Sequence, residues 1–256
     1  VTYVYHSAAF VSFEPDKYHL LRKTNIEGTA NIVNLCVANN IKKLCYVSSI
    51  AAIGESSKDK EITEDSEWNN EADNSVYAIT KYGAEIEVWR GSQEGLDVVI
   101  VNPGVVIGAG IWRYGSGSIF NKVFKGNSYF TKGTIGLVDI EDVVNIMIIL
   151  VQNNIKNERF ILVGEIWTYK KFLQTIASNL NVALPKKEAK LWQLQMIWRL
   201  DWLINKLNGR RRRLTKQLAR ALVTEKIYNN NKITGTINYT FKPVEESITE
   251  VSRLFL

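Results

Sequence analysis

The sequence predicts an α/β fold built around a doubly wound parallel sheet. Short apolar runs at residues 1–5, 44–47, 98–101 and 160–163 have the length of strands, and they lack an alternation of apolar and polar residues. Such runs are typical of strands that are covered on both faces. Segments with helical spacing separate them, at residues 25–39, 77–89 and 140–150. Strands and helices that alternate in this way build a parallel sheet between two layers of helices.

Composition favours a globular protein with a sizeable core. With 256 residues, a mass of 29.1 kDa and 46% hydrophobic residues, the chain can form one large domain or two small ones. Its formal net charge of +6 permits binding to an anionic partner but does not require it. Much of the excess lies in Lys186, Lys187, Lys190 and residues 210–213, which we expect to form a solvated loop. Because no nucleic-acid recognition motif accompanies this cluster, we expect no nucleic-acid partner.

Cysteine usage and hydropathy favour the cytoplasm. Cys36 and Cys45 fall in a predicted helix and a predicted strand, where reduced core residues are more typical than a disulfide. No apolar run reaches the roughly 18 residues of a membrane span, and no secretory signal is recognisable. We therefore expect a cytoplasmic protein without a membrane span, and we expect no metal site.

A tyrosine and a lysine spaced four residues apart suggest acid/base chemistry. Tyr77 and Lys81 lie on one face of a predicted helix, and a nearby cation favours the phenolate form of a tyrosine. Ser49 follows a predicted strand and can bind the same substrate oxygen. A second copy of the pattern, Tyr228 to Lys232, lies in an Asn-rich run, so the pattern alone is weak evidence.

Six short motifs, in one order along the chain, carry a resemblance to a known family. They are His6-Ser7-Ala8-Ala9, Asn25-Ile26-Glu27-Gly28-Thr29, the segment 46–54, Tyr77-x-x-x-Lys81, the segment 102–108 and the segment 138–143. Together they resemble the extended short-chain dehydrogenase/reductase family, the NAD-dependent epimerase/dehydratase group. The residues within the motifs are most similar to those of its dihydroflavonol-reductase-like branch. The match covers residues 1 to about 165.

The resemblance implies a Rossmann-type sheet, a cofactor that is NAD or NADP, and a set of catalytic and cofactor-binding residues. Ser49, Tyr77 and Lys81 would be catalytic, with Tyr77 as acid/base and Lys81 holding the nicotinamide ribose and lowering the phenol pKa. The residues implied to contact the cofactor are Ser7, Ala8, Ala9, Asn25, Ser48, Tyr77, Lys81, Val101, Pro103, Gly104 and Val105.

The implied function is an NAD(P)-dependent oxidoreductase that interconverts a carbonyl and an alcohol on a small organic substrate. The alternative is a nucleotide-sugar epimerase or dehydratase, for which Arg113, Lys122, Lys125 or Arg159 could bind phosphate. A protein that only binds NAD(P) is disfavoured, because it would not need Ser49, Tyr77 and Lys81.

Four ranges of the chain have different expected roles. Residues 1–110 would be the catalytic part of the Rossmann domain, 111–136 an insertion belonging to the substrate domain, and 137–165 a return to the sheet. Residues 166–256 would form a smaller, mainly helical substrate domain. Within it, the Trp-rich helix expected at 191–207 should pack on its own domain, with a membrane surface as the alternative.

One departure from the family pattern concerns the phosphates of the cofactor. The family begins with a Gly-x-x-Gly-x-x-Gly turn that binds the pyrophosphate at a helix N-terminus, and this sequence contains no such turn. We therefore expect that an amino-terminal βαβ portion of roughly 60 residues is missing, and that the chain alone binds NAD(P) weakly.

A homodimer is also expected. Tyr82, Ile86 and Trp89 on one helix, with Val33 and Val37 on another, give more apolar surface than one sheet face needs. The resemblance implies that these two helices pack against their copies in a partner chain. Alternatively, Tyr82 and Trp89 lie under the acidic segment 55–74 of the same chain.

Overall fold

A computed structural model describes residues 1–54, 61–208, 212 and 214–256. The run of arginines at 210–213 and part of the acidic segment 55–74 therefore lie largely or partly outside the described residues. The chain forms two compact units, of which the first comprises Val1–Gly104, Ile140–Val163 and Tyr228–Phe241 and the second comprises Val105–Asp139, Gly164–Ile227 and Lys242–Leu256.

The first unit contains the parallel sheet that the sequence predicts. Its four strands lie in the order β1, β2, β4, β8, and every neighbouring pair is parallel. The strands are β1 (Tyr3–His6), β2 (Lys43–Val47), β4 (Asp97–Pro103) and β8 (Glu158–Leu162). β2 and β4 are almost wholly buried, whereas Tyr3 and Tyr5 of the edge strand β1 are exposed. The predicted α/β fold with a parallel sheet is confirmed.

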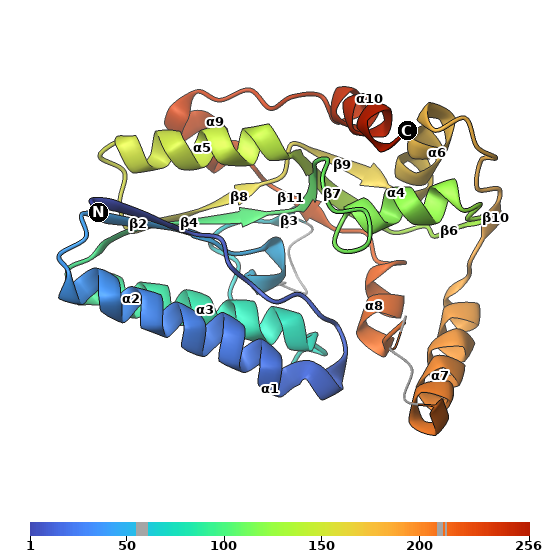
Figure 1. The fold of residues 1–256 in the computed structure, drawn as a ribbon, viewed down its shortest axis with the longest axis horizontal. Coiled ribbons are helices and arrows are strands. Elements are labelled where there is room, and N and C mark those ends of the chain that lie inside the picture. Colours follow the sequence, from blue (N-terminus) through green and yellow to red (C-terminus); the bar gives the residue numbers. More distant parts are fainter. Residues whose placement is uncertain (55–60, 209–211, 213) are drawn as a thin grey trace. The chain divides into compact units, whose positions relative to one another are not determined.

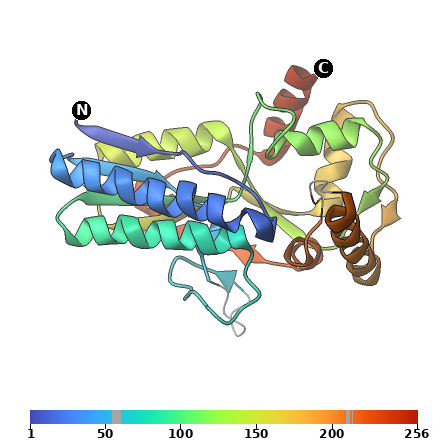
Figure 2. The same ribbon diagram turned by 60° about the horizontal axis from the view of Figure 1, so that its bottom comes forward.

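Helices cover both faces of this sheet (Figure 1). α2 (Gly28–Ala38) and α3 (Val76–Gln93) lie side by side on one face, as Figure 2 also shows. α5 (Ile140–Gln152) packs on β2 and β4 from the other face, and α9 (Asn231–Ile237) packs on β8. Residues 228–241 thus belong with the sheet, although the sequence suggested that everything beyond 166 would be substrate domain.

The first helix is longer than the sequence predicted. It begins at α1 (Tyr18–Leu21), continues through a π-helical turn (Arg22–Glu27) and becomes α2. The prediction placed its start at residue 25, which lies inside the π-helical turn. Gly83 of α3 faces this π turn, and a Cβ added there would lie 2.7 Å from the side chain of Ile26. The glycine therefore permits the close approach of the two helices.

Four short elements remain in the first unit and at its boundary with the second in the sequence. They are the 3₁₀ turns Pro15–Lys17 and Ile50–Ala52, and the two-residue strands β3 (Glu61–Ile62) and β11 (Ile227–Tyr228).

The second unit has a three-stranded mixed sheet and its own core. β5 (Val105–Ile107) is parallel to β7 (Thr134–Asp139), which is antiparallel to β9 (Glu165–Thr168). A second, two-stranded sheet joins β6 (Tyr129–Phe130) to β10 (Lys187–Glu188). The helices are α4 (Gly117–Phe124), α6 (Tyr169–Asn179), α7 (Leu191–Asn208), α8 (Lys216–Ala221) and α10 (Val244–Phe255). Side chains such as Phe120, Trp167 and Phe172 fill this core.

None of the helices in the described part of the chain is long and apolar enough to cross a membrane.

A buried lysine closes the carboxyl end of α5. The Nζ of Lys43, which is 4% exposed, donates to the carbonyl oxygens of Leu150, Asn153 and Ile155 over 2.5 to 3.2 Å. The last carbonyls of a helix have no partner within the helix, and a positive charge there also complements the helix dipole. Burial lowers the pKa of Lys43, yet the three acceptors keep the group satisfied.

Lys43→Met should therefore lower the free energy of unfolding of the protein by about 2–4 kcal/mol, since it leaves buried carbonyls without donors. Urea unfolding followed by circular dichroism measures this loss. Lys42→Met is the matched control on the exposed neighbour and should change stability by less than about 0.5 kcal/mol. Equal effects of the two substitutions would show that the Lys43 contacts contribute nothing specific.

Candidate active site

The carboxyl ends of three neighbouring strands form one edge of the sheet in the first unit. His6 of β1 pairs with Tyr46 of β2, which pairs with Ile100 of β4, so the segments that follow these strands lie side by side. The backbone N–H of Ser48 donates to the carbonyl of Val101 at 2.7 Å. In open parallel sheets this edge is where ligands bind.

Most of the site residues named from the sequence meet at this edge. Ser7, Ala8 and Ala9 are small and exposed after β1, and Ser48 and Ser49 follow β2. Val101 and Pro103 lie in the last part of β4, and Gly104 follows it. Val105 is the first residue of β5 in the second unit. The other predicted residues therefore share one unit, and Val105 does not belong to it.

Tyr77 stands in the first turn of α3 and interacts with Ser49. Ser75 caps this helix, since its side chain accepts from the backbone N–H of Ala78 at 3.1 Å. The cap fixes where the helix begins, and so it places Tyr77 beside the end of β2. The ring of Phe13 packs edge-on against Tyr77, with ring centroids 5.7 Å apart. Burial raises the pKa of Tyr77, and the Ser49 side chain opposes that rise.

Lys81 is helical with Tyr77, as predicted, but its ammonium is bound elsewhere. Its Nζ donates to the hydroxyl of Tyr46 at 2.6 Å and to the carbonyl of Val47 at 2.9 Å. It also lies 4.4 Å from the centroid of the Tyr46 ring. The expected lowering of the Tyr77 pKa is not found, because burial dominates at that phenol.

Burial also changes the titration of Lys81 itself. The residue is 1% exposed, and loss of solvation lowers its pKa to about 8, while the charge of Glu85 opposes the change. An amine that titrates near neutrality can exchange protons under physiological conditions.

A chain of buried polar side chains leads away from Lys81. Burial raises the pKa of Tyr46, and the Thr29 side chain opposes that rise. Thr29 Oγ1 lies 2.9 Å from Nε2 of His6. Burial and the charge of Lys81 lower the pKa of His6, so its imidazole is neutral at pH 7. The sequence analysis missed Tyr46 and Thr29 as site residues. Each stood in a quoted motif, but only the fold brings the Tyr46 hydroxyl to Lys81 and the Thr29 hydroxyl to His6.

Asn25 anchors the loop that follows β1. Its side-chain oxygen accepts from the backbone N–H of Phe10 at 2.7 Å, and its amide donates to the Phe10 carbonyl at 3.0 Å and to Thr80 Oγ1 at 3.1 Å. The residue is 1% exposed. Asn25 therefore holds the loop bearing residues 7–9 against α3, close to the turn that carries Tyr77.

Asn102 links the backbone of Ser49 to the buried side chain of Glu85. The Asn102 amide donates to the Ser49 carbonyl at 2.9 Å and to a Glu85 carboxylate oxygen at 2.6 Å. Burial raises the pKa of Glu85, and Arg159, 3.4 Å away, is one of the groups that oppose this. A buried carboxylate is stable only with such partners.

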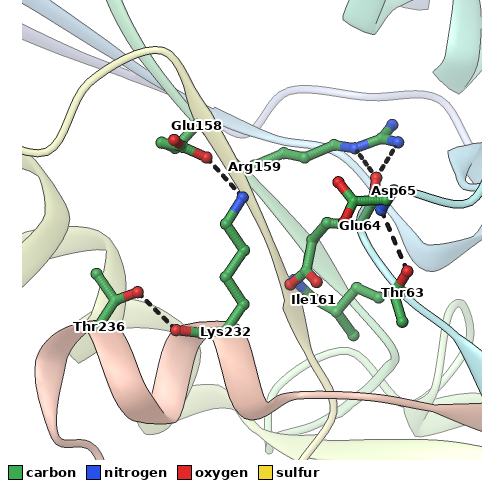
Figure 3. Close-up of polar contacts among 8 residues, drawn as sticks. All are labelled: Thr63, Glu64, Asp65, Glu158, Arg159, Ile161, Lys232 and Thr236. Atoms are coloured by element: carbon green, nitrogen blue, oxygen red, sulfur yellow. Dashed lines mark hydrogen bonds and ion pairs between the residues drawn. The ribbon is translucent and has the colours of Figure 1, made fainter.

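Arg159 joins β8 to the segment that follows β3 (Figure 3). Its Nε and Nη2 both donate to the carbonyl of Glu64, and the Glu64 carboxylate accepts from the N–H of Ile161 at 2.8 Å. The guanidinium of Arg159 thus binds groups of its own unit. This does not fit the suggestion that Arg159 binds a substrate phosphate.

The second Tyr-x-x-x-Lys copy does not form a matching pair. Tyr228 is in β11 and Lys232 is in α9, so the two do not share a helix. Figure 3 shows Lys232 directed at Glu158 of β8, with Nζ 2.5 Å from the carboxylate. This copy is a structural contact between α9 and the sheet.

Comparison with known proteins agrees with this geometry. The chain belongs to the NAD-binding family described as male sterility protein, whose model matches residues 1–156. It is 27% identical to cinnamoyl-CoA reductase CAD2 of Medicago truncatula over 72% of this chain and 60% of that protein. It is 28% identical to a putative dihydroflavonol 4-reductase of Synechocystis over 74% of this chain and 57% of that protein.

These matches confirm the predicted resemblance to the extended short-chain dehydrogenase/reductase family near its dihydroflavonol-reductase-like branch, and with it the nicotinamide dinucleotide as the class of cofactor. The chain spans 60% and 57% of the length of these two relatives.

Solved structures share the fold. A protein solved as gox2253 superposes with a TM-score of 0.83 at 21% identity, covering 100% of this chain and 78% of that one. UDP-glucose 4-epimerase of Thermotoga maritima, solved with UDP-glucose, gives 0.78 at 19% identity, covering 99% and 77%.

The lowered pKa of Lys81 predicts how stability depends on pH. An unfolded lysine titrates near 10.4, so between pH 8 and 10 the unfolded state holds a proton that the folded state has released. Stability must then rise with pH across this window, and the cost of burying the charge is fully present below it. The free energy of unfolding of the parent protein, minus that of Lys81→Met, should increase from pH 8 to 9.5 by up to about 2 kcal/mol.

Denaturant titrations at four pH values test this dependence. The exposed control Lys42→Met should show no such trend relative to the parent. A difference for Lys81→Met that stays flat or falls over the window would contradict the buried, easily deprotonated amine.

Proposed function

We propose that the protein is an NAD(P)-dependent oxidoreductase that interconverts a carbonyl and an alcohol on a small organic molecule. The observation that carries the proposal is the placement of Tyr77 in the first turn of α3, where the Ser49 side chain influences its pKa, with Lys81 one helical turn further, at the carboxyl edge of a parallel sheet. A phenol and a hydroxyl side by side can bind one substrate oxygen and move its proton.

The strand edge fits a nicotinamide dinucleotide. The side chains of Ser7, Ala8 and Ala9 are small and exposed, so a flat ring can approach the backbone there. Neutral His6 adds no charge beside it. The residues proposed to contact the cofactor within this unit are Ser7, Ala8, Ala9, Ser48, Tyr77, Lys81, Val101, Pro103 and Gly104, with Asn25 holding the loop. Val105 belongs to the second unit and is left out of this set.

Each catalytic side chain has a distinct role. A bound nicotinamide supplies or accepts the hydride. Tyr77 gives a proton to the substrate oxygen during reduction and removes it during oxidation. Ser49 orients that oxygen, and its own position is fixed by Asn102 at its carbonyl. Lys81 would hold the nicotinamide ribose of a bound cofactor. In the present structure Tyr46 holds its ammonium in place.

A nucleotide-sugar epimerase or dehydratase is the second candidate. UDP-glucose 4-epimerase of Vibrio cholerae is 27% identical to this chain over 77% of the chain and 61% of that protein. Of the cations considered for a phosphate, Arg113, Lys122 and Lys125 are exposed in the second unit, and Arg159 is used internally. We favour the reductase because the two relatives described above are reductases.

Tyr77→Phe tests the catalytic assignment in the full-length protein. Turnover should fall by at least about 100-fold, since proton transfer is lost, while cofactor affinity should change less than about threefold. Steady-state kinetics with a panel of aldehydes, ketones and alcohols, and calorimetry with NADH and NADPH, measure the two quantities. Tyr82→Phe on the same helix is the control. A kcat within about threefold of the parent would exclude Tyr77 as the acid/base.

We also propose that the protein is a cytoplasmic homodimer that uses α2 and α3. Buried, free Cys36 and Cys45 suit a reducing compartment. α2 and α3 present Leu35, Ile79 and Ile86 at 60%, 38% and 48% exposure. Tyr82, by contrast, stacks on Trp68 of the same chain with centroids 4.4 Å apart, which supports the alternative for that residue. Trp89 packs against the core, so a substitution of Ile86 is the better test of the proposed dimer interface.

Ile86→Glu should shift the mass measured by light scattering from two chains toward one at micromolar concentration, because a two-fold interface would bring the charge against its copy. Ile111→Glu, at a position that is 70% exposed in the second unit, should leave the mass unchanged. A parent protein that is monomeric under these conditions would exclude the interface.

A further inference from the structure

Helix α7 exposes most of its apolar side chains. Leu194 is its buried residue, and within the second unit the helix packs against α8 (Figure 1). Trp192 is 63% exposed, Leu200 54% and Leu207 73%. The expectation that α7 packs on its own domain therefore holds for its contact with α8 and for Leu194, while most of its apolar side chains stay exposed.

The exposed residues form one stripe. With 3.6 residues per turn, seven apolar side chains fall on one side of α7, opposite Leu194, Trp198 and Asn205. We call this stripe the outer face of α7; it consists of Trp192, Met196, Ile197, Leu200, Leu203, Ile204 and Leu207, all exposed. From first to last residue it is about 22 Å long.

Cations accompany the outer face. Exposed Arg199 and Lys206 lie along one side of it, with Arg199 4.8 Å from the Trp198 ring and Lys206 5.3 Å from the Trp202 ring. The sequence from 186 to 226 contains twelve Lys or Arg and three Asp or Glu, a net charge of +9 in a chain whose total is +6. In the sequence, the positive charge is thus concentrated between residues 186 and 226, the segment that contains α7, and the remainder of the chain is net negative.

We propose that the outer face of α7 binds to the surface of an anionic lipid membrane. Tryptophan and leucine side chains with flanking cations are the combination that lies in the headgroup region, where the apolar stripe leaves water and the cations meet lipid phosphates. Such a helix lies in the plane of the membrane surface and does not span it. A surface-bound protein of this kind would meet apolar substrates at the membrane.

The charge distribution favours lipid over a second copy of the chain. Two copies that packed through this stripe would bring Arg199, Lys206 and their basic neighbours close to the same cations of the partner, without a matching set of acidic residues between 186 and 226. An anionic surface instead attracts the whole cluster.

Vesicle cosedimentation of the full-length protein tests the proposal. Partitioning onto phosphatidylcholine vesicles containing 30% phosphatidylserine should exceed partitioning onto pure phosphatidylcholine by at least about tenfold, and should fall at 0.5 M salt. Trp192→Gln combined with Leu200→Gln should reduce binding at least about tenfold. Ile111→Gln combined with Tyr114→Gln, at positions 70% and 64% exposed in the same unit, should leave it unchanged.

All variants should first be checked for the circular dichroism spectrum and melting temperature of the parent. We expect both to be unchanged, because the substituted side chains are exposed. Equal partitioning of the parent and the α7 variant would overturn the proposal. So would a concentration-dependent dimer in sedimentation velocity that the α7 variant abolishes, since that result would assign the outer face to a second copy. Because no readout depends on turnover, the result is independent of the proposed activity.

Discussion

The burial of the Lys81 ammonium is the constraint on which the site depends. A charge that is 1% exposed requires acceptors, and it finds them in the Tyr46 hydroxyl and the Val47 carbonyl at the end of β2. This contact joins α3 to the central part of the sheet. Since Tyr77 lies one turn before Lys81, the same contact sets where the phenol meets Ser49.

Other charged side chains in the first unit also bind backbone carbonyls. Lys43 binds carbonyls at the end of α5, and Arg159 binds the Glu64 carbonyl. Each of these partners lies roughly a hundred residues from its charge in the sequence. The helices and connecting segments are therefore attached to the sheet by polar contacts as well as by apolar packing, and loss of one such partner leaves a buried group uncompensated.

The two units differ in where their apolar side chains remain exposed. In the first, β2 and β4 are covered on both faces, and the apolar residues that stay exposed on α2 and α3 are few. In the second, α7 keeps a long apolar stripe exposed between basic segments. The first unit carries the candidate active site, and the second carries the exposed stripe that we propose binds a membrane surface.

The sequence by itself determined the parallel sheet, the helix with Tyr77 and Lys81, and the family, because strand length, helical spacing and ordered motifs are local properties of the chain. Only the tertiary structure decided what the side chains contact. Lys81 binds Tyr46, 35 residues away, Asn25 binds the Phe10 backbone, and Arg159 is used internally. The early start of the first helix, the packing of α9 on β8 and the exposure of α7 were likewise invisible in local patterns. They depend on which surfaces remain uncovered once the chain has folded, and that is settled by contacts between residues far apart in the sequence.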